Sequence, residues 1–132
     1  DANRMEQQYV ARHKPGDVLI SFRALVAAVQ DLHTAGIVHC DPKPAHVRES
    51  GDGKIVLVDF DNAADSSNPQ PSGFTYKFCS IEQILRLPPH PLDDLEAAIK
   101  IALVWAGEAF PALPPFAKPK SQRHNLRCAL EY

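Results

Sequence analysis

The stretch that decides the fold runs from residue 32 to residue 44 and reads Leu32-His-Thr-Ala-Gly-Ile-Val-His-Cys-Asp-Pro-Lys-Pro44. Gly36 ends the helical pattern before it, because glycine commonly follows the last turn of a helix. Ile37 and Val38 are β-branched and favour a short strand, and Asp41 follows in a polar, proline-containing segment. A carboxylate at a strand end is held by a rigid backbone, as metal binding and general-base chemistry require, although most such aspartates only form turns.

Two helical patterns flank this stretch. Upstream, apolar residues recur with a helical period and predict a helix over residues 17–34. Downstream, Asp93 and Asp94 provide a start signal, and the same period predicts a second long helix over residues 94–106. We expect the two helices to pack on each other, and the residues expected in their core are Leu25, Val29, Leu32, Leu95, Ile99 and Leu103.

The region between the helices is typical of a small hairpin followed by a loop. Residues 47–48 and 54–58 are strand-like, and the turn sequence Gly-Asp-Gly at 51–53 separates them. Residues 61–73 are too polar and too interrupted to bury themselves, so we expect a mobile surface loop there. A short helical piece is expected at residues 80–87.

Composition excludes several classes of protein. The chain has 132 residues, which is at most one domain or a piece of a larger one. Lys and Arg total 14 against 16 Asp and Glu, a formal net charge of −2, and the basic residues are scattered. We therefore expect no nucleic acid as a partner. We also expect no membrane association, because no run approaches the ~18 uncharged apolar residues of a membrane span.

Cysteine usage and the start of the chain indicate its compartment and its extent. Cys40, Cys79 and Cys128 lack the C-x-x-C spacing of zinc and redox sites, which indicates free thiols in a reducing compartment. An intracellular protein, cytoplasmic or nuclear, is therefore expected. The sequence begins without Met or a leader-like apolar segment, which predicts a fragment.

Four short motifs follow one another in the order found in protein kinases. Residues 32–44 resemble the family's helix and catalytic loop, H-R-D-x-K-P-x-N, and residues 59–61, Asp-Phe-Asp, resemble its D-F-G motif. Residues 74–82 resemble the segment that ends in A-P-E, and residues 94–96 resemble the start of the helix that anchors the catalytic loop. The resemblance covers about residues 17–110 and extends to the spacing of the motifs.

This resemblance implies an α+β, mainly α fold: a partial C-terminal lobe of a protein-kinase-like fold with a small β-hairpin region. The segments it implies are a helix at 17–36, a catalytic loop and β region at 37–60, an activation-segment-like loop at 61–82, an anchoring helix at 94–106 and an irregular tail at 107–132. The 132 residues contain no glycine-rich loop, strand lysine or partner glutamate of a small lobe. The chain alone is therefore expected to be inactive and to bind no cofactor.

The resemblance also implies roles for individual residues. Asp41 would accept or orient the proton of the substrate hydroxyl, and Lys43 would meet the transferred phosphoryl group. Asp59 would hold Mg²⁺ on the phosphates of ATP. Lys43 two residues after the base, with Thr75 available to bridge to Asp41, resembles serine/threonine kinases rather than tyrosine kinases.

Three further residues have structural roles in the resemblance. His39 would tie the catalytic loop to the turn at Asp59. Glu82 corresponds to the glutamate of A-P-E, whose arginine partner would lie beyond residue 132. Asp94 would cap its helix and bond the backbone of the catalytic loop.

Several positions depart from the family's motifs. His46 replaces the asparagine that acts as the second metal ligand, and an imidazole is a poor ligand for Mg²⁺. If nucleotide and metal are still bound, His46 predicts a shift from Mg²⁺ toward Mn²⁺. Cys40 replaces the arginine before the base, Asp61 replaces the glycine of D-F-G, and Ile81 replaces the proline of A-P-E.

Three functions remain open at this point. The first is a fragment of a serine/threonine-kinase-like domain whose parent transfers phosphate from ATP to a protein hydroxyl, with Mg²⁺ or Mn²⁺. The second is a pseudokinase lobe that binds or regulates another protein. The third is a small-molecule phosphotransferase related to aminoglycoside kinases, which the Lys43-Pro44 pair and residues 75–82 disfavour. The expected partners are a protein substrate, a regulatory protein or a second copy bound through exposed helix surface.

Overall fold

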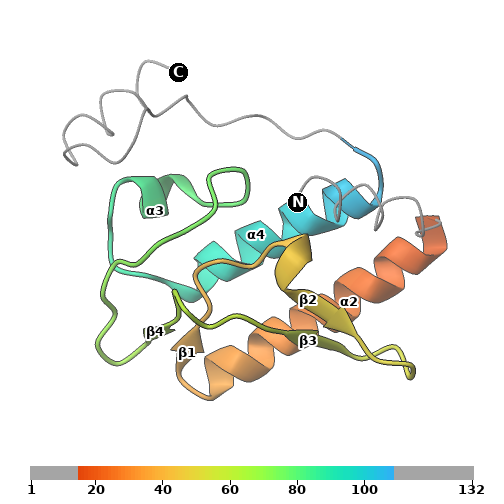
Figure 1. Ribbon diagram of the computed structural model, residues 1–132, viewed down its shortest axis with the longest axis horizontal. Coiled ribbons are helices and arrows are strands. Elements are labelled where there is room, and N and C mark those ends of the chain that lie inside the picture. Colours follow the sequence, from red (N-terminus) through yellow and green to blue (C-terminus); the bar gives the residue numbers. More distant parts are fainter. Residues whose placement is uncertain (1–14, 109–132) are drawn as a thin grey trace.

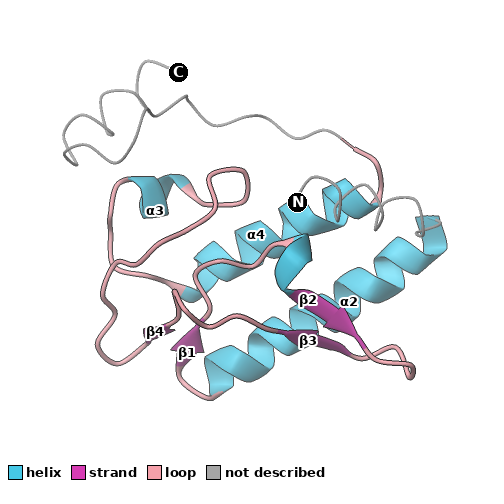
Figure 2. Cartoon of the chain, viewed as in Figure 1, coloured by secondary structure: helices cyan, strands magenta, loops and turns pink. Residues whose placement is uncertain are grey.

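A computed structural model of the chain describes residues 15–108 (Figure 1). In chain order its elements are α2 (Pro15–Thr34), β1 (Ile37–Val38), the 3-10 turn η1 (Pro44–His46), β2 (Val47–Glu49), β3 (Ile55–Leu57), β4 (Ala64–Asp65), α3 (Ile81–Ile84) and α4 (Pro91–Trp105). Figure 2 shows that helices dominate and that the strands are short. The expected α+β, mainly helical class is therefore confirmed, and it is compatible with a partial kinase-like lobe.

The core of the described chain lies where α2, α4 and the β2–β3 hairpin meet (Figure 1). Its buried members are Val18, Leu25, Val29, Val47, Ile55, Leu57, Phe78, Ala97, Ala98, Ile101, Val104 and Trp105. Leu32 and Leu95 are partly buried against this cluster. The expected packing of the two long helices is thus confirmed.

Two residues of the expected core were wrong, and one of them is Leu103, which is only partly buried and is not among the residues that pack against this cluster. Ile99 is 52% exposed, whereas Ala98 and Ile101 on the same helix are fully buried. Successive helical residues are rotated by about 100° around the axis, so the residue between two buried positions can point to solvent. The buried face of α4 therefore includes Ala98 and Ile101 and excludes Ile99.

The hairpin pairs β2 with β3 in the antiparallel register Val47↔Leu57, Arg48↔Val56 and Glu49↔Ile55. Side chains alternate in burial along β3, as in a sheet with one face on the core, whereas in β2 Val47 is buried and Arg48 and Glu49 are both exposed. The turn contains Gly53 at φ 83°, a left-handed conformation that glycine adopts without a Cβ penalty. The expected hairpin is confirmed at this position.

The segment expected to be a surface loop is fixed at one point. Ala64–Asp65 forms β4 and pairs antiparallel with β1, and the Ser66 amide donates to the Gly36 carbonyl at 2.9 Å. Ala64 is buried against Val38 and Cys40. The expectation of a mobile surface loop over 61–73 was therefore wrong at residues 64–65, because this two-residue pairing depends on a partner far away in sequence.

The boundaries of all three helices differ from the sequence expectation. Helix α2 begins at Pro15 rather than at residue 17, and it ends at Thr34, as the apolar period predicts and two residues before the end that the resemblance implies. Helix α3 spans only Ile81–Ile84, with Ser80 as its N-cap. Helix α4 begins at Pro91 rather than at residue 94, because His90 is its N-cap and Asp93 completes a capping box. The expectation that Asp94 caps this helix was wrong.

Two further expectations concern the C-terminal tail and membrane-spanning segments. The irregular tail expected at 107–132 falls outside the described residues from position 109 onward. Within residues 15–108, no helix combines the length and the apolar character needed to cross a membrane.

Candidate functional site

Asp94 of α4 anchors the loop after β1 by accepting hydrogen bonds from its backbone. The backbone amides of His39 and Cys40 donate to the two oxygens of the Asp94 carboxylate at 2.8 and 2.9 Å, and His33 Nε2 lies 2.9 Å from the same group. Asp94 is fully buried. A buried carboxylate is stable only when hydrogen bonds compensate its desolvation, and these three contacts provide them.

Cys40 is held at both of its backbone polar groups. Its φ is 73°, a left-handed conformation that is rare for residues other than glycine, asparagine and aspartate. Its amide donates to Asp94, and its carbonyl accepts a hydrogen bond from Gln83 Nε2 at 2.6 Å. Gln83 also forms a capping box with Ser80, which fixes the amide side chain. The contacts on either side of Cys40 therefore stabilise the conformation that precedes Asp41.

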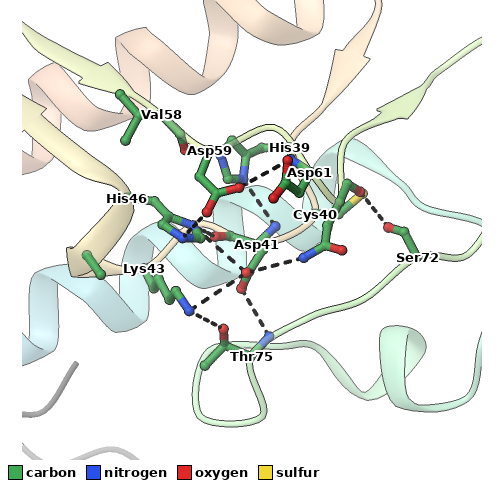
Figure 3. Close-up of polar contacts among 12 residues, drawn as sticks. His39, Cys40, Asp41, Lys43, His46, Val58, Asp59, Asp61, Ser72 and Thr75 are labelled. Atoms are coloured by element: carbon green, nitrogen blue, oxygen red, sulfur yellow. Dashed lines mark hydrogen bonds and ion pairs between the residues drawn. The ribbon is translucent and has the colours of Figure 1, made fainter. Parts of the chain in front are cut away.

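The Asp41 carboxylate receives contacts from three separate segments (Figure 3). The Thr75 amide donates to Asp41 Oδ1 at 3.0 Å, and Asn62 Nδ2 lies 3.5 Å from Oδ2. Lys43 Nζ lies 3.9 Å from Oδ2 and donates to Thr75 Oγ1 at 2.9 Å. The structure thus brings together Asp41, Lys43 and Thr75, although Thr75 contacts Asp41 through its backbone and Lys43 through its hydroxyl.

His39 connects this loop to the turn at Asp59. The amide of Asp41 donates to His39 Nδ1 at 3.2 Å, so Nδ1 is the unprotonated nitrogen and Nε2 carries the hydrogen. Nε2 then donates to the Val58 carbonyl at 2.9 Å. The ring is fully buried and lies 5.3 Å from the Phe60 ring between centroids. His39 is therefore a neutral scaffold residue.

Asp59 and His46 form the open side of the site. Asp59 has a left-handed backbone, φ 62°, and its side chain is 43% exposed. His46 Nε2 lies 3.1 Å from Asp59 Oδ2, and Nδ1 lies 2.8 Å from the carbonyl oxygen of Asp41. Figure 3 shows the imidazole between the Asp41 and Asp59 side chains.

The two described cysteines are buried, free thiols. Burial raises the pKa of the Cys40 thiol to about 11, although a contact with Ser72 lowers it, and the Asp94 charge adds to the rise. Burial likewise raises the pKa of Cys79 to about 12. A thiol that stays protonated at neutral pH is a poor nucleophile, so Cys40 beside Asp41 has a packing role.

The structure does not bring every expected site residue together. Asp41, Lys43, His46, Asp59 and Thr75 are joined by contacts, with His39 and Asp94 beneath them. Glu82 lies apart, exposed on the first turn of α3. Sequence reasoning missed Asn62 and Gln83. The Ser-x-x-Gln pattern at 80–83 signals a capping box but not a bond to Cys40.

In the described part of the chain, a metal ion at this site would have two protein ligands, Asp59 and His46. Among residues 15–108, no group of three or more His, Cys, Asp or Glu side chains is arranged to hold a metal ion. Asp59 and His46 converge as a carboxylate and an imidazole. Two protein ligands fit an ion whose remaining positions are filled by phosphate oxygens and water.

Comparison with known proteins gives one partial similarity. No protein-family model matches the chain. Over 56 residues, 42% of this chain, the sequence is 39% identical to the serine/threonine-protein kinase PKH3 of Saccharomyces cerevisiae. The matched stretch covers 6% of that yeast protein's length. A minority of this chain is therefore similar to a small part of a serine/threonine kinase.

Proposed function

We propose that this chain is the catalytic-loop portion of a serine/threonine-kinase-like domain, whose parent transfers the terminal phosphate of ATP to a protein hydroxyl. The observation that carries the proposal is the arrangement of Asp41, Lys43 and Thr75. A buried carboxylate and a lysine ammonium lie 3.9 Å apart and both contact Thr75. The similarity over 56 residues to a yeast serine/threonine kinase supports the same class.

In this proposal each polar group has a defined task. Asp41 orients the substrate hydroxyl and accepts its proton, because an ionised carboxylate is an acceptor only. Lys43 neutralises charge on the phosphoryl group as it transfers. Thr75 holds both groups, so the acceptor and the cation keep a fixed separation. Such positioning is the main contribution of a protein to phosphoryl transfer.

Asp59 and His46 would hold the divalent ion that accompanies ATP. When bound, that ion supplies charge neutralisation on the phosphates. Asp59 is suited to this because its side chain is 43% exposed and lies across His46 from Asp41. The 132 residues lack a glycine-rich loop and a strand lysine, so the chain alone is expected to be inactive.

One observation favours a second candidate, a pseudokinase lobe that acts by binding another protein. His46 contacts Asp59 at 3.1 Å and so engages the carboxylate that the metal would need. If that contact persists in the presence of nucleotide, Asp59 cannot bind the metal ion. The lobe then has the kinase-like fold but does not transfer phosphate.

Transfer of radiolabelled phosphate from ATP to a generic basic protein tests the proposal. The full-length protein that carries this sequence should transfer phosphate with Mg²⁺ or Mn²⁺, whereas the 132-residue chain should not. Asp41→Asn should reduce transfer by about 10²-fold or more, the usual contribution of a positioned base. Asp52→Asn, which removes an exposed carboxylate in the hairpin turn, is the matched control and should leave transfer unchanged.

Two results would contradict this assignment. Absence of transfer by the full-length protein with either metal favours the binding module. Transfer that is unaffected by Asp41→Asn places the reaction elsewhere in the protein.

A further inference from the structure

The connection from α3 to α4 contains the sequence Leu-Pro-Pro-His-Pro at residues 87–91. Proline fixes its own φ at about −65° and restricts the residue before it to extended conformations. Leu87, Pro88 and His90 each precede a proline, and His90 has φ −131° and ψ 145°. In Figure 1 the chain runs without a coil on its way from α3 to α4. The sequence therefore holds this connection close to a polyproline II conformation.

The two amides of this connection are bonded within the chain, whereas its first three carbonyls are not. The Leu87 amide donates to a carbonyl of α3 at 3.1 Å, and the His90 amide donates to Asp93 at 3.0 Å. In the described part of the chain, no donor reaches the carbonyls of Leu87, Pro88 and Pro89. These three carbonyls can therefore accept hydrogen bonds from a partner.

The two sides of the connection differ in exposure. A polyproline II helix has about three residues per turn, so residues three apart share a face. Pro89 lines a small hollow together with Cys40 and Gln83, which places it against the protein. Pro88 is exposed, and Pro91, which shares its face, is partly exposed. The face that carries two prolines is thus the one that a partner can reach.

Both ends of the connection are fixed. Arg86 has a left-handed backbone, φ 60°, and its guanidinium donates to the Ser72 carbonyl at 2.9 Å. At the other end His90 is the N-cap of α4, and its ring accepts from the Leu92 amide at 3.1 Å. A segment that is already held in its bound conformation loses little conformational entropy on binding.

We propose that residues 87–91 are a docking segment for another protein, one whose domain binds polyproline II helices in a groove lined with aromatic side chains. Such grooves recognise prolines spaced as P-x-x-P, and Pro88 and Pro91 have this spacing. The inference is independent of phosphate transfer, because it requires only that the connection is exposed and extended.

Binding of the fluorescently labelled 132-residue chain to a panel of purified SH3, WW and EVH1 domains tests the proposal. At least one domain should bind, and titration followed by fluorescence anisotropy gives the dissociation constant. Pro88→Ala and Pro91→Ala should each weaken binding by about tenfold, since each removes one anchor from the groove.

The variants should keep their fold. Alanine is tolerated in an exposed connection and at the first position of a helix, where Pro88 and Pro91 lie. Pro69→Ala is the matched control, because it removes a proline from the 61–73 loop and leaves the docking segment intact. It should bind like the wild type. Circular dichroism should show the same helix content in all four proteins.

A synthetic peptide of residues 85–93 separates recognition of the sequence from access to it in the fold. The folded chain should bind at least as tightly as the peptide, because the peptide must be ordered on binding. The proposal is wrong if the peptide binds and the folded chain does not, or if neither binds any domain at millimolar concentration. It is also wrong if Pro88→Ala and Pro91→Ala bind like the wild type. None of these results bears on the phosphate-transfer assay, whose failure would likewise leave the docking segment in place.

Discussion

Asp41 and Asp59 both follow short strands, and each lies at or directly after a residue with a left-handed backbone. Their surroundings differ. Asp41 is 7% exposed and is contacted from the loops at residues 43, 62 and 75. The Asp59 side chain is 43% exposed, and its contacts in the described chain are with His46 Nε2 and with the Asp61 amide, which donates to Oδ1 at 3.3 Å. The Asp41 side is therefore part of the packed scaffold, and the Asp59 side is open.

Because of this difference, mutations on the two sides should have different effects on stability and on ligand binding. Cys40, the residue before Asp41, is tied to Asp94 on α4, a helix that is itself in the core. Changes beneath Asp41 should therefore alter the free energy of unfolding as well as any activity. Changes at Asp59 should alter ligand binding with little effect on folding. The predictions below test this separation, beginning with the largest expected loss of stability.

Asp94→Ala should produce the largest loss of stability. The substitution leaves the buried amides of His39 and Cys40 without their acceptor and His33 without its carboxylate contact. We expect a decrease of about 3–5 kcal/mol in the free energy of unfolding, a large part of the ~5–15 kcal/mol of an ordinary domain. Urea unfolding followed by circular dichroism measures it.

Asp59→Ala is the matched comparison for Asp94→Ala. The same substitution at an exposed carboxylate should lower stability by only about 1 kcal/mol, most of it from alanine at the left-handed φ of 62°. Equal losses in the two variants would break the separation between a packed side and an open side.

The sequence predicted the helices better than it predicted their faces and ends. Leu25 and Val29 were identified as core because an apolar period over 20 helical residues is a local signal. Ile99 was misplaced because Ala98 and Ile99 are adjacent apolar residues, and only packing against α2 decides between them. The pairing of β4 with β1 involves two residues a side, too few for a recognisable pattern.

Within the candidate site, the sequence identified motif residues but not the contacts that hold them. Asp41, Lys43 and Asp59 were singled out by order and spacing along the chain. Asn62 and Gln83 were missed because their contacts with the catalytic loop arise only when distant segments pack. Side chains that support a backbone carbonyl carry no motif of their own.

Gln83→Met should have a smaller effect on the same packed side. Methionine has similar length but cannot donate to the Cys40 carbonyl or accept from the Ser80 amide. We expect a loss of about 1–2 kcal/mol in the free energy of unfolding. Gln70→Met is the matched control, because Gln70 is exposed and bonds only to Asn68 among the contacts described for its side chain. A loss no larger than in this control would show that Cys40 needs no support from α3.

Alkaline pH should also act only on the packed side. Burial raises the pKa of Cys40 to about 11 and that of Cys79 to about 12, from an ordinary value of 9.0. Above pH 9 the unfolded thiols ionise while the folded ones stay protonated, so this contribution to stability is complete below pH 9 and declines as the pH rises toward 12.

Unfolding in urea at pH 8, 9 and 10 should show a steeper decline in the free energy of unfolding for the wild type than for a Cys40→Ala, Cys79→Ala variant. Lysines and tyrosines also titrate in this range, so the difference between the two proteins isolates the thiols. If thiolate absorbance near pH 9 appeared in the folded wild type but not in a Cys40→Ala variant, water would reach Cys40, and the contrast between Asp41 and Asp59 would be lost.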